Sequence, residues 1–353
     1  MYRALQVEDR YQALCQTLVQ NAAKCSTKEA WPAESMEACG IAGVHRWFVD
    51  RDLGGDGWSE GEVIDGYLML SRHCLTTAFI LTQRTGAMKR IAGSGNTTAI
   101  ERWLLGLLQG TCFGTVGISH LTTSRQHLKQ PALVARSCGP SRYRLHGYSP
   151  WVTGAAHADV LVVAAVTEQG DQILVAVPTL LPGVRVAEPM ELIAVSGSCT
   201  GRVDFEEVEI GPDELLAGPS PDVMKQGVGA GTGGLQTTTL ALGVSMAAID
   251  FLQHESEVRK ELSEVAQKLK ADCLAIIDDL HEWQTPRCTP GELRQRANSM
   301  VLRSTQAALT AAKGAGFVEG HPVGRWAREA LFFLVWSCPQ PVLQANLCEL
   351  AGL

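Results

Sequence analysis

The sequence predicts an α+β protein in which a central β domain, an antiparallel sheet or small barrel, separates two helical parts. Before residue 110, apolar residues recur at three- and four-residue steps, which is typical of amphipathic helices. Short runs rich in Val and Ile, broken by Gly, Pro and Asp, follow, and helical periodicity then returns. We therefore expect an N-terminal α-helical domain over 1–110, a β domain over 111–217 and a C-terminal helical bundle over 218–353.

The first helical part contains three amphipathic segments, at 2–25, 59–92 and 96–110. Ser59 followed by Glu62 is a capping-box pattern, and it predicts where the second segment begins. The paired glycines and aspartates of "DRDLGGDGW" just before it predict a turn.

The central part contains seven β-rich runs: "CFGTVGIS", "PALVARSC", "RYRLHGYS", "ADVLVVAAVT", "DQILVAVP", "GVRVAEP" and "GRVDFEEVEI". So many short runs in about 100 residues favour an antiparallel sheet or a small barrel. The segment "GPDELLAGPSPD" that follows reads as a connection to four further helical segments.

Charge and composition exclude several classes of function. The chain has 30 basic and 37 acidic residues, a formal net charge of -7, and no Lys/Arg run longer than a pair, so nucleic acid is not an expected partner. No stretch reaches the ~18 apolar residues of a membrane span, and the charged N-terminus does not resemble a signal peptide. The 11 cysteines form no C-x-x-C pair, and we predict a cytoplasmic protein with no metal site.

The stretch "SPWVTGAAHADVLVVAA" places Trp151 and Thr153 just before an apolar strand. A turn there needs Gly154 and Pro150 for its backbone, but it does not need a bulky indole beside a hydroxyl. The two readings are a core Trp beside a strand-start Thr, or a site that holds a ligand.

Six phrases in the chain, spread in order over roughly residues 35–335, resemble the acyl-CoA dehydrogenase family of flavoproteins. They are "DRDLGGDGWS", "LSRHCLTTAFIL", "WLLGLLQGTCFG", "HGYSPWVTGAAHADVLVVAA", "VSGSCTGRVDFEEVEI" and "HPVGRWAREA". The family's architecture is an N-terminal helical domain, a central β-barrel and a C-terminal four-helix bundle. The resemblance therefore implies the same three parts that the composition predicts.

The resemblance also implies how a flavin would be held. In the family a Trp-Ile-Thr corner packs an indole near the flavin and hydrogen-bonds the isoalloxazine through the threonine, so Trp151, Val152 and Thr153 would hold the ring here. Ser119 stands for another flavin-contacting threonine of the family. At the adenine end, the family's Gln and Gly-Gly are replaced here by Thr310 and by Lys313 with Gly314. Because these contacts differ, the cofactor implied is FAD, with FMN or none as alternatives.

The family's catalytic glutamate has no counterpart in this sequence. It follows an Arg-Asp-Ala phrase by seven residues, and that count from Ala330 reaches Ser337. A serine hydroxyl is too weak a base at neutral pH unless another group activates it. His120 follows Ser119, and its imidazole exchanges protons near pH 7. His120 and Ser337 are therefore the candidate catalytic residues, with a structural role as the alternative for each.

Three functions remain open from the sequence. The first is a flavin-dependent oxidoreductase acting on an acyl thioester such as an acyl-CoA, with an unusual or absent base. The second is a flavin-dependent monooxygenase of the same fold, and the third is a non-catalytic binding or assembly protein. The segment "GGLQTTTLALGVSMAAIDFL" is apolar on nearly all sides, which predicts burial on more than one face and so a homodimer or homotetramer.

Overall fold

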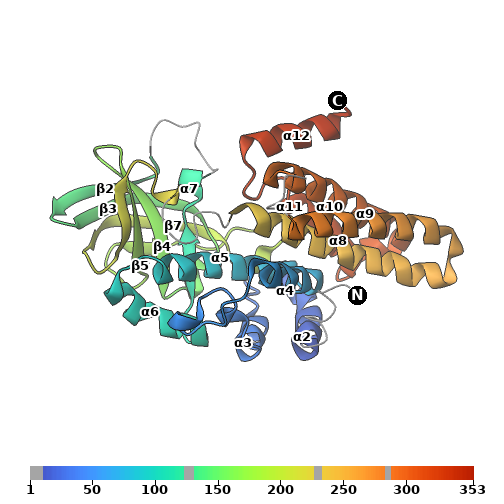
Figure 1. Cartoon of the computed structure of the whole chain (residues 1–353), viewed down its shortest axis with the longest axis horizontal. Coiled ribbons are helices and arrows are strands. Elements are labelled where there is room, and N and C mark those ends of the chain that lie inside the picture. Colours follow the sequence, from blue (N-terminus) through green and yellow to red (C-terminus); the bar gives the residue numbers. More distant parts are fainter. Residues whose placement is uncertain (1–10, 123–130, 226–232, 283–287) are drawn as a thin grey trace.

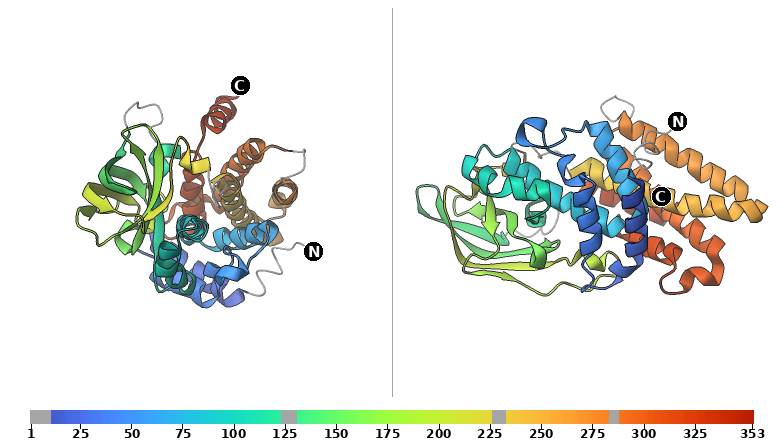
Figure 2. Two further views of the ribbon diagram at one scale, coloured as in Figure 1. Left: turned by 60° about the vertical axis from the view of Figure 1, so that its left-hand side comes forward. Right: turned by 90° about the horizontal axis from the view of Figure 1, so that it is seen from below.

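A computed structural model describes residues 11–122, 131–225, 233–282 and 288–353 of the chain. The elements follow the predicted order of helices, sheet and helices, which confirms the predicted fold class (Figure 1). The sheet and the C-terminal helices lie at opposite ends of the molecule. The N-terminal helices lie across the junction between them (Figure 2, right).

The N-terminal helices are α2 (Gln12–Ala22), α3 (Ala33–Ile41), α4 (Glu60–His73), α5 (Leu75–Ala92) and α6 (Thr97–Gln109). The predicted capping box is confirmed: the Glu62 amide donates to the Ser59 hydroxyl, and the Ser59 amide donates to the Glu62 carboxylate at 2.8 Å. The α5 helix contacts strand β1 (Gly114–Gly117) and helix α8 (Gly233–Val258), and so connects the sheet to the bundle.

The sheet has eight strands in the order β6-β7-β3-β2-β4-β5-β8, with β1 paired to β4. The remaining strands are β2 (Leu133–Gly139), β3 (Arg142–Val152), β4 (Val160–Thr167), β5 (Gln172–Pro178), β6 (Val184–Val186), β7 (Gly201–Ile210) and β8 (Leu215–Ser220). All seven predicted runs form strands. The eighth, β8, lies in the segment that the sequence predicts to be a connection, so the strands continue past residue 217.

The sheet is mixed and not purely antiparallel, because β4 pairs in parallel with both β1 and β2. The other pairs described are antiparallel, as predicted. Both faces of β4 are buried. One face packs into the core that the strands enclose among themselves, through Leu161, Val163 and Ala165. The other face packs into a core shared with α5 and α6, through Val160, Val162 and Ala164. This explains why β4 reads as a continuous apolar run.

The C-terminal part contains α8, α9 (Ser263–His281), α10 (Pro290–Ala312), α11 (Pro322–Phe332) and α12 (Gln340–Ala351). The apolar α8 helix lies among α4, α9 and α10 of the same chain. By length and composition Leu235–Val258 could cross a membrane, but 78% of its most apolar window is buried within the fold, as in a core helix. The chain itself therefore covers α8, and the apolar surface of this helix no longer argues for an oligomer.

The crossing of α4 and α8 depends on one glycine. A Cβ atom at Gly243 would lie 2.0 Å from the Ser71 hydroxyl oxygen and 2.6 Å from the Leu68 carbonyl oxygen. No side chain fits at that separation. The two helix backbones therefore approach as closely as only a glycine allows, and this contact holds the N-terminal helices against the bundle.

Candidate functional site

A cavity of about 880 Å³ lies where the N-terminal helices, the sheet and the bundle meet. Its walls come from α5, the connection after β1, the end of β3, the loop at 192–200, Met224, the start of α8, and α11 with the turn that follows it. We call this cavity the α5 pocket. It is large enough for a cofactor or a drug-sized ligand.

The end of β3 places the predicted corner at this pocket. Trp151 lines the pocket and is 47% exposed, and Thr153 lines it while being almost completely buried. Val152, between them, points away from the pocket into the interior of the sheet. The next residue, Gly154, has a φ of 64° and donates its amide to the Ser198 carbonyl at 2.9 Å, a left-handed conformation that favours glycine. The alternation of the strand thus directs the indole and the hydroxyl into the pocket.

A chain of buried hydroxyls supports Thr153. Its Oγ1 lies 3.0 Å from Thr200 Oγ1, which in turn lies 2.8 Å from Ser198 Oγ. Thr200 also lines the pocket. Each hydroxyl can donate or accept, so the direction of these hydrogen bonds can adjust to a ligand atom.

The loop that carries Thr200 has an unusual backbone. Val195 and Cys199 have φ values of 54° and 47°, which side chains with a Cβ atom rarely adopt. The Ser196 hydroxyl donates to the Leu192 carbonyl at 2.6 Å and accepts from the Leu192 amide at 3.0 Å, and so closes the loop. Such strained residues cost about 1–3 kcal/mol each and cluster at functional sites.

Three aromatic side chains form the wall on the bundle side. Phe332 and Trp336 stack at 5.2 Å between ring centroids, and Phe79 of α5 meets them edge-on at 4.9 and 5.0 Å. The buried Arg294 of α10 donates to the carbonyls of Phe333 and Trp336 at 2.9 and 3.0 Å. Arg294 therefore holds the turn that carries this wall.

Ser337 lies at the end of that turn, with a φ of 45°, and it lines the pocket. The residues described around the α5 pocket include no Asp or Glu. Their polar groups are hydroxyls, amides, indole N–H groups and one guanidinium, which donate hydrogen bonds but do not accept a proton near neutral pH. The role of Ser337 in catalysis stays a prediction.

Ser119 and His120 lie in the four-residue helix α7 (Ser119–Thr122) and face different directions. Ser119 lines the α5 pocket. His120 is buried behind it, and its Nε2 donates to the Ala164 carbonyl of β4 at 2.8 Å. Burial lowers the pKa of His120. Its contact with β4 is that of a structural histidine, and a catalytic role for it stays a prediction.

Lys313 and Gly314 lie far from the α5 pocket within one chain. They follow the end of α10, which is joined to the end of α8 by a hydrogen bond of 2.7 Å from Arg259 to the Ala311 carbonyl. The pocket contacts α8 at Gln236, near its other end, roughly 30 Å away along the helix axis. A ligand ring in the pocket and these two residues would meet only through an extended cofactor or a second copy of the chain.

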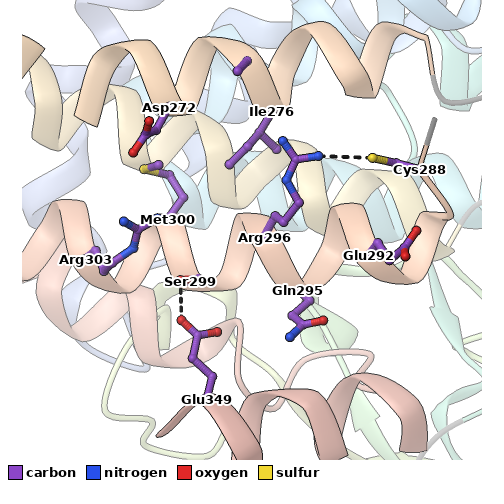
Figure 3. Close-up of a pocket in the computed structure, with 11 residues that line it drawn as sticks. Asp272, Ile276, Cys288, Glu292, Gln295, Arg296, Ser299, Met300, Arg303 and Glu349 are labelled. Carbon is purple, nitrogen blue, oxygen red and sulfur yellow. Dashed lines mark hydrogen bonds between the residues drawn. The ribbon is translucent and has the colours of Figure 1, made fainter. Parts of the chain in front are cut away.

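A second cavity, of about 570 Å³, lies within the bundle between α9, α10 and α12. Figure 3 shows its charged lining, with Arg296 directed at Cys288 and Ser299 bonded to Glu349. Arg296 also pairs with Asp279 at 2.7 Å. None of the predicted site residues lines this bundle cavity.

Several residues of the α5 pocket were not predicted from the sequence, among them Phe79, Arg90, Thr200, Phe332 and Trp336. They lie far apart along the chain and meet only in the fold. The small polar stretch "VSGSCT" and the aromatic run "FFLVW" are unusual enough to be noticed in the sequence. Neither stretch, however, indicates which other part of the chain it contacts.

No family model matches the chain. It is 23% identical to the short-chain specific acyl-CoA dehydrogenase of cattle mitochondria (Bos taurus), over 94% of this chain and 87% of that protein. Its structure is similar to a glutaryl-CoA dehydrogenase from Mycobacterium smegmatis in complex with FADH2, with a TM-score of 0.80, 16% identity, and coverage of 97% of this chain and 95% of the other.

A second solved structure with this fold is that of KijD3 in complex with FMN and dTDP-3-amino-2,3,6-trideoxy-4-keto-3-methyl-D-glucose. The TM-score is 0.76 at 18% identity, and the match covers 100% of this chain and 94% of the other. The sequence likeness extends over nearly the whole chain, and the structural likeness covers all three of its parts. The chain is therefore a distant homologue of the acyl-CoA dehydrogenases and has their fold.

Proposed function

We propose that this chain is a flavin-dependent oxidoreductase of the acyl-CoA dehydrogenase type that acts on an acyl thioester or a related substrate. The observation that carries the proposal is the pair of walls of the α5 pocket. Trp151 and the buried hydroxyl of Thr153 lie on the sheet side, and the stacked rings of Phe332 and Trp336 lie on the bundle side. A pocket with aromatic walls and few polar groups fits a planar conjugated ring.

The chain's own residues would seat FAD or FMN in defined ways. The Trp151 indole would cover one side of the ring and exclude water, and the Thr153 hydroxyl would donate a hydrogen bond to a ring nitrogen. Thr200 and Ser198 would keep the Thr153 hydroxyl in place through their hydrogen bonds. When bound, the flavin would supply the electron-accepting group of the reaction.

The base in this proposal is unusual or absent. Proton abstraction near neutral pH suits a carboxylate or an imidazole, and the residues described around the pocket include neither. Ser337 forms part of the pocket wall, and the ring of His120 is hydrogen-bonded to the Ala164 carbonyl of β4. In this proposal the described wall positions the substrate, and it does not take up its proton.

The lack of a carboxylate or an imidazole among the described lining residues favours a second candidate, a flavin-dependent monooxygenase. The reaction of such an enzyme does not need a carboxylate base. A non-catalytic binding protein is the third candidate. We also propose a cytoplasmic homodimer or homotetramer, in which Lys313 and Gly314 of one copy would approach a cofactor held mainly by another. The distance of these residues from the pocket along α8 supports this last point.

The test is the identity and amount of the small molecule released from the purified full-length chain. We expect a yellow protein with flavin absorption bands, and one FAD or FMN per chain by mass spectrometry. Trp151→Ala and Thr153→Val should lower flavin occupancy, whereas Trp103→Ala on α6, outside the described lining, should not. A colourless wild-type protein that also fails to take up added flavin would contradict the proposal and support the non-catalytic alternative.

Turnover separates the two enzyme candidates. Bleaching of the flavin by an acyl-CoA without oxygen supports the dehydrogenase reading. Oxygen-dependent consumption of NADH in the presence of a separate flavin reductase, without such bleaching, supports the monooxygenase.

A further inference from the structure

The α5 helix lines the pocket along much of its length, and its two ends present different chemistry to the pocket. Phe79, Gly86 and Arg90 all line the pocket from this helix. Phe79 joins the aromatic wall, whereas Arg90 lies eleven residues further on, roughly 16 Å away at ~1.5 Å per residue. The pocket is therefore apolar and aromatic at one end of α5 and cationic at the other.

The Arg90 guanidinium is held against the pocket wall. Its Nη1 donates to the Gly86 carbonyl, one turn earlier, at 2.9 Å. Gly86 has no side chain to push it away: a Cβ there would lie 3.3 Å from Val116 Cγ1 and 3.4 Å from Arg90 Nη1. The other N–H groups of Arg90 have no hydrogen-bond partner among the described residues. A guanidinium has five N–H donors, so most of its capacity is available to a ligand.

The charge of Arg90 has no counterpart in the described part of the chain. No Asp or Glu lines the pocket there, and no ion pair of Arg90 is found. Burial lowers the pKa of Arg90 to about 10, so the side chain stays protonated at neutral pH. The segments 123–130 and 226–232, which the structure does not describe, contain no acidic residue in their sequences. Its neighbour Lys89 differs, because Asp50 and Glu60 lie close enough to stabilise its charge.

We infer that Arg90 binds an oxyanion, a carboxylate or a phosphate, of the ligand that occupies the α5 pocket. A half-buried guanidinium that makes one neutral hydrogen bond has N–H groups left for an oxyanion, and it can donate two parallel bonds to two oxygens of a carboxylate or a phosphate. The inference rests on the proposed function in that the ligand is a flavin or its acyl thioester substrate. The anion can belong to the flavin phosphate, to the coenzyme A moiety or to a carboxylate on the acyl chain.

The test compares matched probes on the full-length protein. Riboflavin and FMN differ by a phosphate, and pentanoyl-CoA and glutaryl-CoA differ by a carboxylate in place of a terminal methyl group. Dissociation constants are measured for wild type, Arg90→Gln, Arg90→Lys and the control Lys89→Gln. The control removes the same charge from the adjacent residue, which is not among the described lining residues. Arg90→Met, which keeps the apolar contacts of the stem, replaces Arg90→Gln if the latter lowers the melting temperature.

We expect Arg90→Gln to weaken binding of the anionic probe by about tenfold or more, and Arg90→Lys to restore part of it. Weaker FMN with unchanged riboflavin assigns the anion to the flavin phosphate. Weaker glutaryl-CoA with unchanged pentanoyl-CoA assigns it to the acyl chain, and equal weakening of both thioesters assigns it to coenzyme A.

The inference is overturned if Arg90→Gln weakens no probe more than Lys89→Gln does, since Arg90 is then a solvated surface charge. Failure of every probe to bind also overturns it. A wild-type protein that binds no flavin, but loses affinity for a CoA thioester on Arg90→Gln, would contradict the proposed function and leave the anion site standing.

Discussion

The α5 pocket and the bundle cavity differ in how the charges of their linings are balanced. In the bundle cavity, acidic and basic side chains share the lining. Arg296 pairs with Asp279, Glu349 accepts from Ser299, and Arg303 lines the cavity together with Asp272 and Glu292. In the α5 pocket, an aromatic and apolar wall carries a few buried hydroxyls and one guanidinium that no described acid faces. A lining in which acidic and basic groups balance one another needs no charged ligand, whereas an apolar pocket with a few available polar groups is typical of a binding site. The unbalanced charge of the α5 pocket and its larger volume therefore both identify it as the candidate site.

The largest effect is expected when each cavity is filled in turn by a larger side chain. Ala194 lines the α5 pocket and Ala275 lines the bundle cavity. We expect Ala194→Trp to weaken flavin binding about 100-fold or more, equal to about 2.7 kcal/mol, because the indole occupies the ligand's volume. Ala275→Trp should leave it unchanged. Flavin fluorescence titration measures both, and similar flavin affinities in the two variants would remove the assignment of the site.

A smaller effect is expected from the hydroxyl chain. Thr200→Val removes a group that bonds to both Thr153 and Ser198 in a buried setting. We expect the free energy of unfolding to fall by about 2 kcal/mol, because two buried hydroxyls lose their partner. Ser299→Ala in the bundle cavity should cost no more than about 0.5 kcal/mol, since its bond is exposed to solvent. Urea denaturation of the two variants tests this, and equal losses would contradict it.

The smallest effect concerns pH and the histidine behind the α5 pocket. The folded pKa of His120 lies below its unfolded value of about 6.5 because its ring is buried and Nδ1 has no acceptor among the described residues. Below about pH 6.5 the unfolded state therefore binds more protons than the folded state, so stability falls as pH falls through this value.

His120→Gln, whose amide can still donate to the Ala164 carbonyl, should reduce that loss of stability. The measurement is the urea unfolding free energy at several pH values between 8 and about 5. The exposed His254→Gln is the matched control and should follow the wild type. Parallel curves for wild type and His120→Gln would mean that this histidine does not titrate differently on folding.

The sequence predicts the architecture well because local patterns carry most of it. Helical periodicity, the Ser59 capping box and the alternating strands are read over a few residues at a time. The strand β8 was missed because Gly218 and Pro219 within it are typical of turns. The parallel pairing of β4 was missed because the alternation of side chains is the same in parallel and antiparallel strands.

The candidate site was predicted only where it is continuous in sequence. Trp151 and Thr153 are two residues apart on one strand, so their common direction follows from its alternation. Arg90, Thr200 and Trp336 come from three separate parts of the chain, and no spacing relates them. Ser119 and His120 are adjacent, but a short helix turns one toward the pocket and the other toward β4.

The hydrogen bonds from Arg294 to the turn after α11 make the helical bundle support the wall of the α5 pocket. Because that turn carries Trp336 and Ser337, the shape of the ligand wall is maintained by a helix that does not itself touch the ligand. Loosening of α10 would therefore release the wall while the β-sheet remains intact. The mouth of the site and the C-terminal helices should thus behave as one cooperative unit during partial unfolding.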